Sequence, residues 1–206
     1  MRRQAALSVL TVAISLIGAW NLQSTSQVAA DATVGKAYFA GGCFWCMEEA
    51  FEKVEGVLSA TSGYMGGKVA NPSYEEVSAG RTGHAESVEV VYDQAKVSYQ
   101  KLLDAFWRNV DPITPNAQFC DHGSQYRSAV FFQTDEEKRA SDTSKQVIEQ
   151  SKRFTEPIVT QIVMASQFYP AEEYHQDFYK KNPIRYKFYK YNCRRAQRLE
   201  ELWGKP

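Results

Sequence analysis

The spacing of apolar and polar positions divides most of the chain between strands and helices. Alternating or β-branched apolar runs predict strands, and these cover residues 36–40, 57–64, 87–92, 128–133 and 158–165. Helical spacing predicts helices over residues 44–54, 98–110 and 134–153. The latter two begin at the capping residues Ser98 and Thr134. A short helix is expected at 73–79, and short helices and loops, broken at Asn182-Pro183, from 171 to 203.

Two successive strand–helix–strand groups with short connections indicate the fold class. We expect an α+β two-layer sandwich, with helices packed on one mainly antiparallel, mixed sheet around a ferredoxin-like core. The C-terminal tail, about residues 171–206, is expected to be irregular.

The first thirty residues have the pattern of a secretory signal peptide. Arg2 and Arg3 precede an apolar run from Ala5 to Trp20, and small residues end the segment at Ala30. An uncleaved anchor is the alternative, but the run is shorter than the roughly 20 residues that span a bilayer. We therefore expect an exported, periplasmic protein whose residues 31–206 form a single domain, with no membrane attachment after cleavage.

Charge and composition exclude some classes of function. The 24 basic and 24 acidic residues balance, and aromatic residues make up 13% of the chain. The chain has no excess of positive charge, so its composition gives no reason to expect nucleic acid as a partner. An aromatic-rich enzyme domain is a better interpretation than a disordered or fibrous chain.

Four cysteines remain after residue 30: Cys43, Cys46, Cys120 and Cys193. In an oxidising compartment they could form two structural disulfides, with three possible pairings. A domain of this size does not need disulfides in order to fold, so redox chemistry is the competing interpretation.

The segment Gly41-Gly42-Cys43-Phe44-Trp45-Cys46 places a cysteine at the first turn of a predicted helix. Free backbone N–H groups there stabilise an anion, so we expect the Cys43 pKa to be lowered and the thiolate to act as a nucleophile. Phe44 and Trp45 would form an apolar wall suited to a methyl group. A buried structural cysteine among core aromatic residues is the alternative.

Taken together, the motifs of the chain resemble those of the A-type peptide methionine sulfoxide reductases. The hexapeptide is similar to that family's signature, and four further blocks follow in family order. They are Gly63-Tyr64-Met65-Gly66-Gly67, Asn71-Pro72-Ser73-Tyr74-Glu75-Glu76-Val77, Gly80-Arg81-Thr82-Gly83-His84-Ala85-Glu86 and Asp121-His122-Gly123-Ser124-Gln125-Tyr126-Arg127-Ser128. The resemblance extends over about residues 35–192.

The resemblance implies a role for each matching residue. Cys43 would attack the sulfoxide sulfur, and Glu76 would donate a proton to the sulfoxide oxygen. Tyr64 and Tyr126 would hydrogen-bond that oxygen, while Asp121 would hold the polar side of the site. A carboxyl group kept neutral by an apolar pocket is a suitable acid, because an unprotonated sulfoxide oxygen leaves poorly.

Attack would leave a sulfenic acid on Cys43, which a second thiol converts to a disulfide. We rank the candidates for this resolving thiol as Cys193, in the tail where the family commonly keeps one, then Cys120, then Cys46. The family more often has Gly-Asn-Asp where this chain has Phe119-Cys120-Asp121, so the resolving step stays open.

The resemblance also implies the substrate and the partner. Oxidised proteins or free methionine S-sulfoxide would be the substrate, and a thioredoxin-like reductant would regenerate the enzyme, with no cofactor and no metal. We expect a monomer that repairs oxidised proteins. His84, Glu86 and His175 are expected to support the site from behind.

Two other functions compete with this hypothesis. Cys43-Phe44-Trp45-Cys46 has the spacing of a thioredoxin-like dithiol oxidoreductase, although no downstream cis-proline loop is recognisable. Alternatively, Cys43, Cys46, Cys120 and His122 could bind a metal, but one closely spaced pair is weak evidence for a zinc site.

Overall fold

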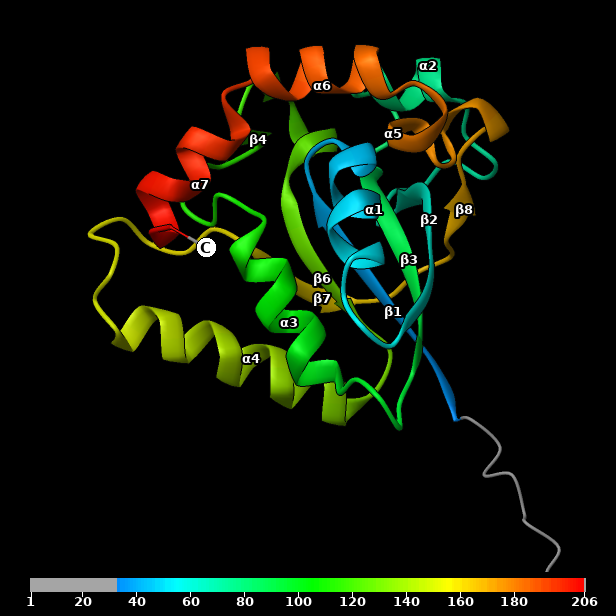
Figure 1. The fold of residues 1–206 in the computed structure, drawn as a ribbon. Helices are drawn as coiled ribbons and strands as arrows, with labels where there is room; N and C mark the ends of the chain where they lie inside the picture. The colour runs from blue at the N-terminus through cyan, green and yellow to red at the C-terminus, as the bar shows by residue number, and fades with distance from the viewer. Residues whose placement is uncertain (1–32, 206) are drawn as a thin grey trace, which may run out of the picture. The chain divides into compact units, whose positions relative to one another are not determined.

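A computed structural model describes residues 33–205 (Figure 1). The predicted signal peptide, residues 1–30, lies outside the described residues. Among the helices of residues 33–205, none has both the length and the apolar character that a bilayer crossing requires.

The elements follow the predicted order, with additional short ones near the site. The strands are β1 (Val34–Gly41), β2 (Val57–Met65), β3 (Ala85–Asp93), β4 (Ala117–Gln118), β5 (Asp121–His122), β6 (Ser128–Phe132), β7 (Gln161–Met164) and β8 (Tyr169–Pro170). The helices are α1 (Phe44–Glu52), α2 (Tyr74–Ser78), α3 (Tyr99–Arg108), α4 (Asp135–Gln150), α5 (Phe178–Lys181), α6 (Pro183–Asn192) and α7 (Arg195–Trp203), with 3₁₀ turns η1 (Ser124–Tyr126) and η2 (Glu173–His175).

The main sheet has six strands in the order β7-β6-β1-β3-β2-β8. Strand β3 pairs antiparallel with β1 and β2, β6 pairs antiparallel with β1, and β8 pairs antiparallel with β2. Only β6 and β7 are paired in parallel within the described sheet. The central order β6-β1-β3-β2, with α1 and α3 as the connecting helices, is that of a ferredoxin-like core, so the predicted fold class is confirmed.

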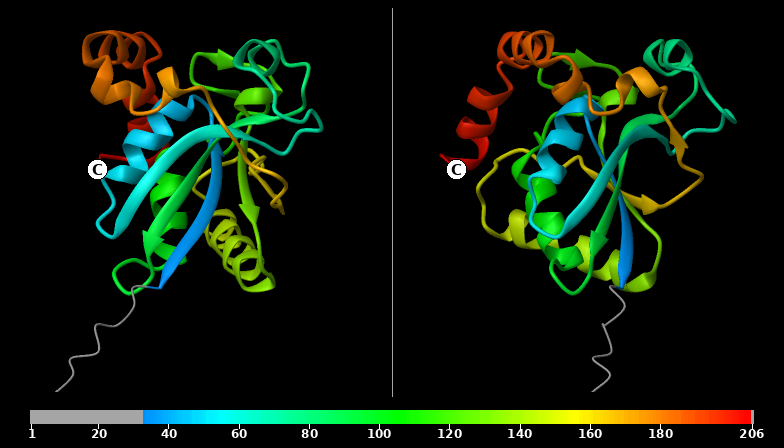
Figure 2. Two further views of the ribbon diagram at one scale, coloured as in Figure 1. Left: turned by 90° about the vertical axis from the view of Figure 1, so that its right-hand side faces the viewer. Right: turned by 45° about the vertical axis from the view of Figure 1, so that its right-hand side comes forward.

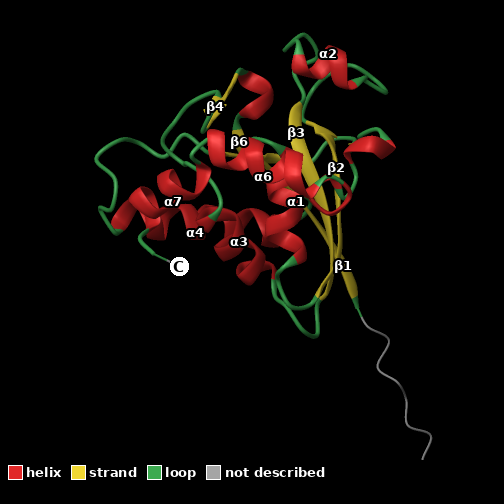
Figure 3. Ribbon diagram, turned by 45° about the horizontal axis from the view of Figure 1, so that its top comes forward, coloured by secondary structure: helices red, strands yellow, loops and turns green. Residues whose placement is uncertain are grey.

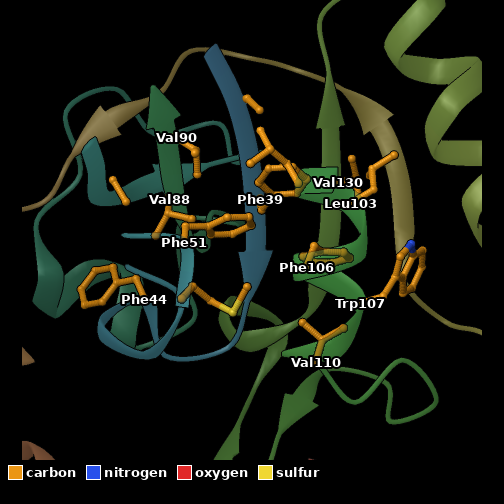
Figure 4. Close-up of a cluster of buried hydrophobic side chains, with 14 of the residues drawn as sticks. Phe39, Phe44, Phe51, Val88, Val90, Leu103, Phe106, Trp107, Val110 and Val130 are labelled. Carbon is orange, nitrogen blue, oxygen red and sulfur yellow. The ribbon is translucent and has the colours of Figure 1, made fainter. Parts of the chain in front are cut away.

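Helices α1 and α3 pack on one face of this sheet and close the hydrophobic core. Phe39 of β1 stacks on Phe51 of α1 and on Phe106 of α3, with ring centroids 4.8 and 5.4 Å apart (Figure 4). All three side chains are buried. Each contributes about 1.5–3 kcal/mol through the burial of its apolar surface. This rigid layer fixes the start of α1, where the first motif lies.

In the C-terminal tail, which we expected to be an irregular run of short helices and loops, the structure has η2, α5, α6 and α7, with α6 beginning at Pro183. Helices α6 and α7 lie on the same side of the sheet as α1 (Figure 2). The Tyr186 hydroxyl and the Lys190 ammonium of α6 both reach the Glu49 carboxylate of α1. These polar contacts hold α6 against α1, while Ile184, Phe188 and Tyr191 of the same helix stay exposed.

Candidate active site

The turn between β1 and α1 aims Cys43 at the end of the sheet. Gly42 has φ of +78°, and a Cβ atom on it would lie 2.4 Å from Cβ of Gln118, so both backbone conformation and space require glycine. Cys43 is the N-cap residue of α1, and only 5% of its surface is exposed.

A cavity of about 50 Å³ opens beside Cys43. Residues from six segments of the chain line it: Cys43, Phe44, Trp45, Tyr74, Glu86, Asp121, Tyr126 and Tyr189. Helix α6, which carries Tyr189, lies across the end of the sheet opposite the start of β1 (Figures 1 and 2). The cavity therefore brings together a thiol, two carboxyl groups, three phenols and two apolar rings.

Glu86 supplies a buried carboxyl group to the same cavity as the Cys43 thiol. Its Oε2 accepts a hydrogen bond of 3.0 Å from the backbone N–H of Phe44. Burial raises the pKa of Glu86 to about 8, and the negative charge of Asp121 adds to the effect of burial. Glu86 is therefore mostly protonated at pH 7 and can donate a proton to a bound group.

The phenols around the cavity keep their protons. Burial raises the pKa of Tyr74 to about 12, and the carboxyl of Glu86 contributes to this shift. Burial also raises the pKa of Tyr126. Neutral phenols are hydrogen-bond donors that stabilise charge growing on an oxygen atom without titrating near pH 7.

The apolar wall is held from behind. The Trp45 ring stacks on Phe178 with centroids 3.8 Å apart, and its Nε1–H donates to Nδ1 of His175 over 3.1 Å. His175 is buried and also lies 4.9 Å from the Phe44 ring. His175 therefore contacts both rings of the apolar wall.

The two thiols of the hexapeptide lie side by side in one buried cluster. Burial raises the pKa of Cys43, and hydrogen bonding with Cys46 adds to this, so the expected lowering at the helix start does not occur in the resting site. The hydrogen bond from Cys43, together with Arg195, lowers the pKa of Cys46 to about 6. The two shifts run in opposite directions, so Cys46 gives up its proton before Cys43 does.

The structure places two of the expected site residues away from the cavity. Glu76 is exposed, and its Oε2 accepts from the backbone N–H of Ser73 in a capping box at the start of α2. The Tyr64 hydroxyl donates to Glu172 over 2.8 Å instead. Figure 3 shows α2 apart from α1, beyond the start of β3.

Three residues lie nearer the chemistry than the sequence analysis expected. Glu86 occupies the position that was expected of Glu76, and Tyr74 lines the cavity that was expected to include Tyr64. Tyr189 was not predicted at all. The spacing Ser73-x-x-Glu76 is itself a capping-box signal, and it could have removed Glu76 from the candidates.

His84 braces the loop between β2 and β3. Its Nδ1 accepts from the backbone N–H of Gly67 over 3.0 Å, and its Nε2 lies 2.8 Å from the carbonyl oxygen of Val69. The ring thereby ties the glycine-rich turn to the strand that carries Glu86.

Cys120 and Cys193 form a disulfide, while Cys43 and Cys46 are free thiols. Cys193 ends α6, and Cys120 is exposed directly before Asp121. Within residues 33–205, Cys43, Cys46, Cys120 and His122 do not form a group with metal-binding geometry.

The comparisons with known proteins agree on one family. The model of the family described as "Peptide methionine sulfoxide reductase" matches residues 35–206. The "Peptide methionine sulfoxide reductase MsrA" of Halalkalibacterium halodurans is 46% identical over 170 residues, covering 82% of this chain and 97% of that protein.

Solved structures lead to the same family. Reduced Mxr1 from Saccharomyces cerevisiae is similar with a TM-score of 0.69 and 33% identity, over 75% of this chain and 88% of that one. Mxr1 in complex with Trx2 gives a TM-score of 0.51 and 25% identity, over 72% of this chain and 86% of that one.

Proposed function

Because the chain belongs to the peptide methionine sulfoxide reductase family and reduces methionine sulfoxide, we propose that Cys43 is its nucleophile and that Glu86, rather than Glu76, is its acid. The observation that carries this assignment is the buried Glu86 carboxyl in the same small cavity as the Cys43 thiol, where burial raises its pKa to about 8. Glu76 already has a structural use as the capping residue of α2.

The chemical step balances with one thiolate and one proton. The Cys43 thiolate attacks the sulfoxide sulfur while Glu86 donates its proton to the sulfoxide oxygen. The attack forms a bond between the two sulfur atoms, and the protonated oxygen then passes from the substrate sulfur to the Cys43 sulfur. The substrate's sulfur–oxygen bond and the bond between the two sulfurs break, the substrate sulfur gains two electrons, and Cys43 is left as a sulfenic acid. Methionine and the Glu86 carboxylate are the other products.

Substrate contacts follow from the lining of the cavity. The substrate methyl group lies against Phe44 and Trp45, whose rings offer an apolar surface. The sulfoxide oxygen lies toward the hydroxyl groups of Tyr74 and Tyr126, which donate hydrogen bonds to it. Fixing methyl and oxygen on opposite walls selects one sulfoxide epimer, which we propose is S.

Cys46 is the first resolving thiol in this proposal. It lies beside Cys43 and ionises more readily than an ordinary thiol. Its thiolate attacks the Cys43 sulfenic acid, forms a Cys43–Cys46 disulfide and, after protonation, releases water. Cys193, which we expected to act first, is bonded to Cys120 in the structure.

The Cys120–Cys193 pair then carries the oxidation to the surface. When reduced, one of its thiolates attacks the Cys43–Cys46 disulfide and the other closes the Cys120–Cys193 bond, which returns both interior thiols to the reduced state. A thioredoxin-like dithiol reduces this last bond, as the exposure of Cys120 permits. The complex of the similar Mxr1 with Trx2 supports a partner of this class.

The assignment of the acid is tested with each sulfoxide epimer of a blocked methionine and a dithiol reductant. We expect Cys43→Ser to be inactive and Glu86→Gln to lose about 10²–10⁴-fold in rate. Glu76→Gln is the matched control, since it changes an exposed glutamate to glutamine and should keep nearly full activity. A large loss in Glu76→Gln with an active Glu86→Gln would refute the assignment.

The resolving step is tested in a Cys120→Ser/Cys193→Ser double variant, turned over once without reductant. If Cys46 resolves, two thiols disappear for each methionine formed, and a dimedone-type probe finds no sulfenic acid. Stoichiometric labelling of Cys43 by the probe, with Cys46 still free, would refute the role of Cys46. Adding Cys46→Ser to this variant supplies the positive control for labelling.

We also propose that the protein is exported to the periplasm and that residues 1–30 are removed as a signal peptide. The support is the basic start, the short apolar run and the small residues before position 31. N-terminal sequencing of the protein from the periplasmic fraction should begin at Asp31. A cytoplasmic protein that keeps its first thirty residues would contradict the proposal.

A further inference from the structure

The proposed reaction begins from a Cys43 thiolate, so the proton of the resting Cys43 thiol must first pass to an acceptor. Burial raises the pKa of this thiol, and Glu86 beside it is protonated, so neither solvent nor Glu86 is a ready acceptor. The neighbouring Cys46 thiolate accepts a hydrogen bond from Cys43, but if it took the proton it would become a poorer resolving nucleophile. A further acceptor is needed within reach of the Cys43 sulfur.

Tyr189 links Cys43 to such an acceptor. Its side chain lines the cavity with Cys43 and packs against the buried cluster that holds both thiols. Its hydroxyl donates a hydrogen bond to Oδ2 of Asp121, and hydrogen bonding by Tyr189 opposes the rise in the pKa of Cys43. The Tyr189 ring meets Trp45 edge-on with centroids 5.8 Å apart, and this contact restricts the orientation of the ring.

We propose that the Tyr189 hydroxyl relays the proton of Cys43 to Asp121 as the thiolate attacks. The Cys43 S–H donates its proton to the Tyr189 oxygen, and the Tyr189 O–H proton passes to Oδ2 of Asp121. Tyr189 is neutral before and after, Cys43 becomes a thiolate, and Asp121 becomes a neutral carboxyl. This inference rests on the proposed roles of Cys43 and Glu86 and adds the step before them.

The charges around the relay are consistent with this direction. Three charged or titratable side chains act on Asp121: Glu86 of β3, Arg195 of α7 and His122, the next residue in the chain. Burial raises the pKa of Asp121, so its carboxylate is a better proton acceptor than an exposed one. The transfer is uphill in the resting site, and bonding of the thiolate to the sulfoxide sulfur draws it forward.

The test compares Tyr189→Phe with Tyr191→Phe, on the same helix. Both changes remove only a hydroxyl, but Tyr191 is 82% exposed and lies outside the cavity. We measure the single-turnover rate of methionine formation and the pH dependence of Cys43 alkylation by iodoacetamide, followed on the Cys43 peptide by mass spectrometry. For Tyr189→Phe we expect a roughly tenfold slower first step, a KM within about twofold, and an alkylation midpoint about one pH unit higher.

A double-variant cycle separates a relay from a merely structural contact. If Tyr189 and Asp121 act as one unit, Asp121→Asn combined with Tyr189→Phe is no slower than Asp121→Asn alone. The relay would be overturned if the two losses in rate multiplied in the double variant. It would also be overturned if the Tyr189→Phe enzyme matched Tyr191→Phe in both rate and alkylation. A wild-type enzyme with no sulfoxide reduction would instead overturn the proposed function, so the two failures differ.

Discussion

Replacing Glu86 with Gln should abolish most activity and at the same time stabilise the protein. The folded chain keeps Glu86 protonated up to a pKa of about 8, while an unfolded glutamate ionises at about 4.5. Between these values the unfolded state binds fewer protons than the folded one, so the free energy of unfolding falls as pH rises. In the wild type, the contribution of protonated Glu86 to the free energy of unfolding is therefore complete below pH 4.5 and is lost above pH 8.

The size of the effect follows from the same two pKa values. At pH 7, ionisation favours the unfolded state by about 3 kcal/mol, and above pH 8 by about 5 kcal/mol. A glutamine does not ionise, and its side-chain oxygen can still accept from the Phe44 N–H. Glu86→Gln should therefore raise the melting temperature at pH 7 by about 6–12 °C.

Urea unfolding of wild type and Glu86→Gln at pH 4, 5.5, 7 and 8.5 measures this difference directly. The two proteins should have nearly equal stability at pH 4 and diverge steadily as pH rises. Glu76→Gln should show no such divergence and should lose about 0.5–1 kcal/mol at most, because its capping hydrogen bond is exposed. A pH-independent difference between Glu86→Gln and wild type would refute the reasoning, since burial of an ionisable group would then not be its cause.

Three further results are expected from the same geometry. Tyr64→Phe removes the hydrogen bond to Glu172 and should cost about 1–3 kcal/mol in urea unfolding, with an unchanged single-turnover rate; a tenfold slower rate would return Tyr64 to the substrate site. Opening the 73-residue separation between Cys120 and Cys193 with dithiothreitol should lower the free energy of unfolding by up to about 4 kcal/mol, and equal urea midpoints would contradict this. Gly42→Ala should unfold at lower urea and alkylate abnormally at Cys43, and wild-type behaviour in both would show that the turn tolerates a Cβ.

Local sequence signals were enough to predict the helices and strands that bury one face, because burial of one face sets their pattern of apolar and polar residues. Ser98 and Thr134 cap α3 and α4 as predicted, and the side chain of each accepts from the backbone N–H three residues on. The strands of the ferredoxin-like core were found because β-branched and aromatic residues recur along them. These signals depend on neighbours in the chain, and a single sequence contains them.

The site was predictable only in part, because its decisive contacts join distant segments. The alternating pattern from Ser87 to Tyr92 predicts a strand. It gives no reason to expect that the carboxyl of Glu86, one residue before this strand, is buried. Its burial depends on α1 and β5, which close over it in the folded chain. The pairing of Cys120 with Cys193 was one of several open possibilities for the same reason.

The acids of the cavity share one negative charge across the proposed cycle, and this explains why two carboxyl groups are buried together. Before attack the charge lies on Asp121, with Glu86 and Cys43 protonated. The relay moves the negative charge to Cys43, and proton donation to the substrate then leaves the charge on Glu86. The only other negative charge in the proposed cycle is that of the Cys46 thiolate, and Arg195 compensates it. Because like charges in a buried site disfavour each other, the Asp121 carboxylate keeps Glu86 protonated until the thiolate has formed. On this reasoning Asp121→Asn should lower the pKa of Glu86 as well as slow the first step, which would move the upper pH limit of single-turnover activity below that of wild type.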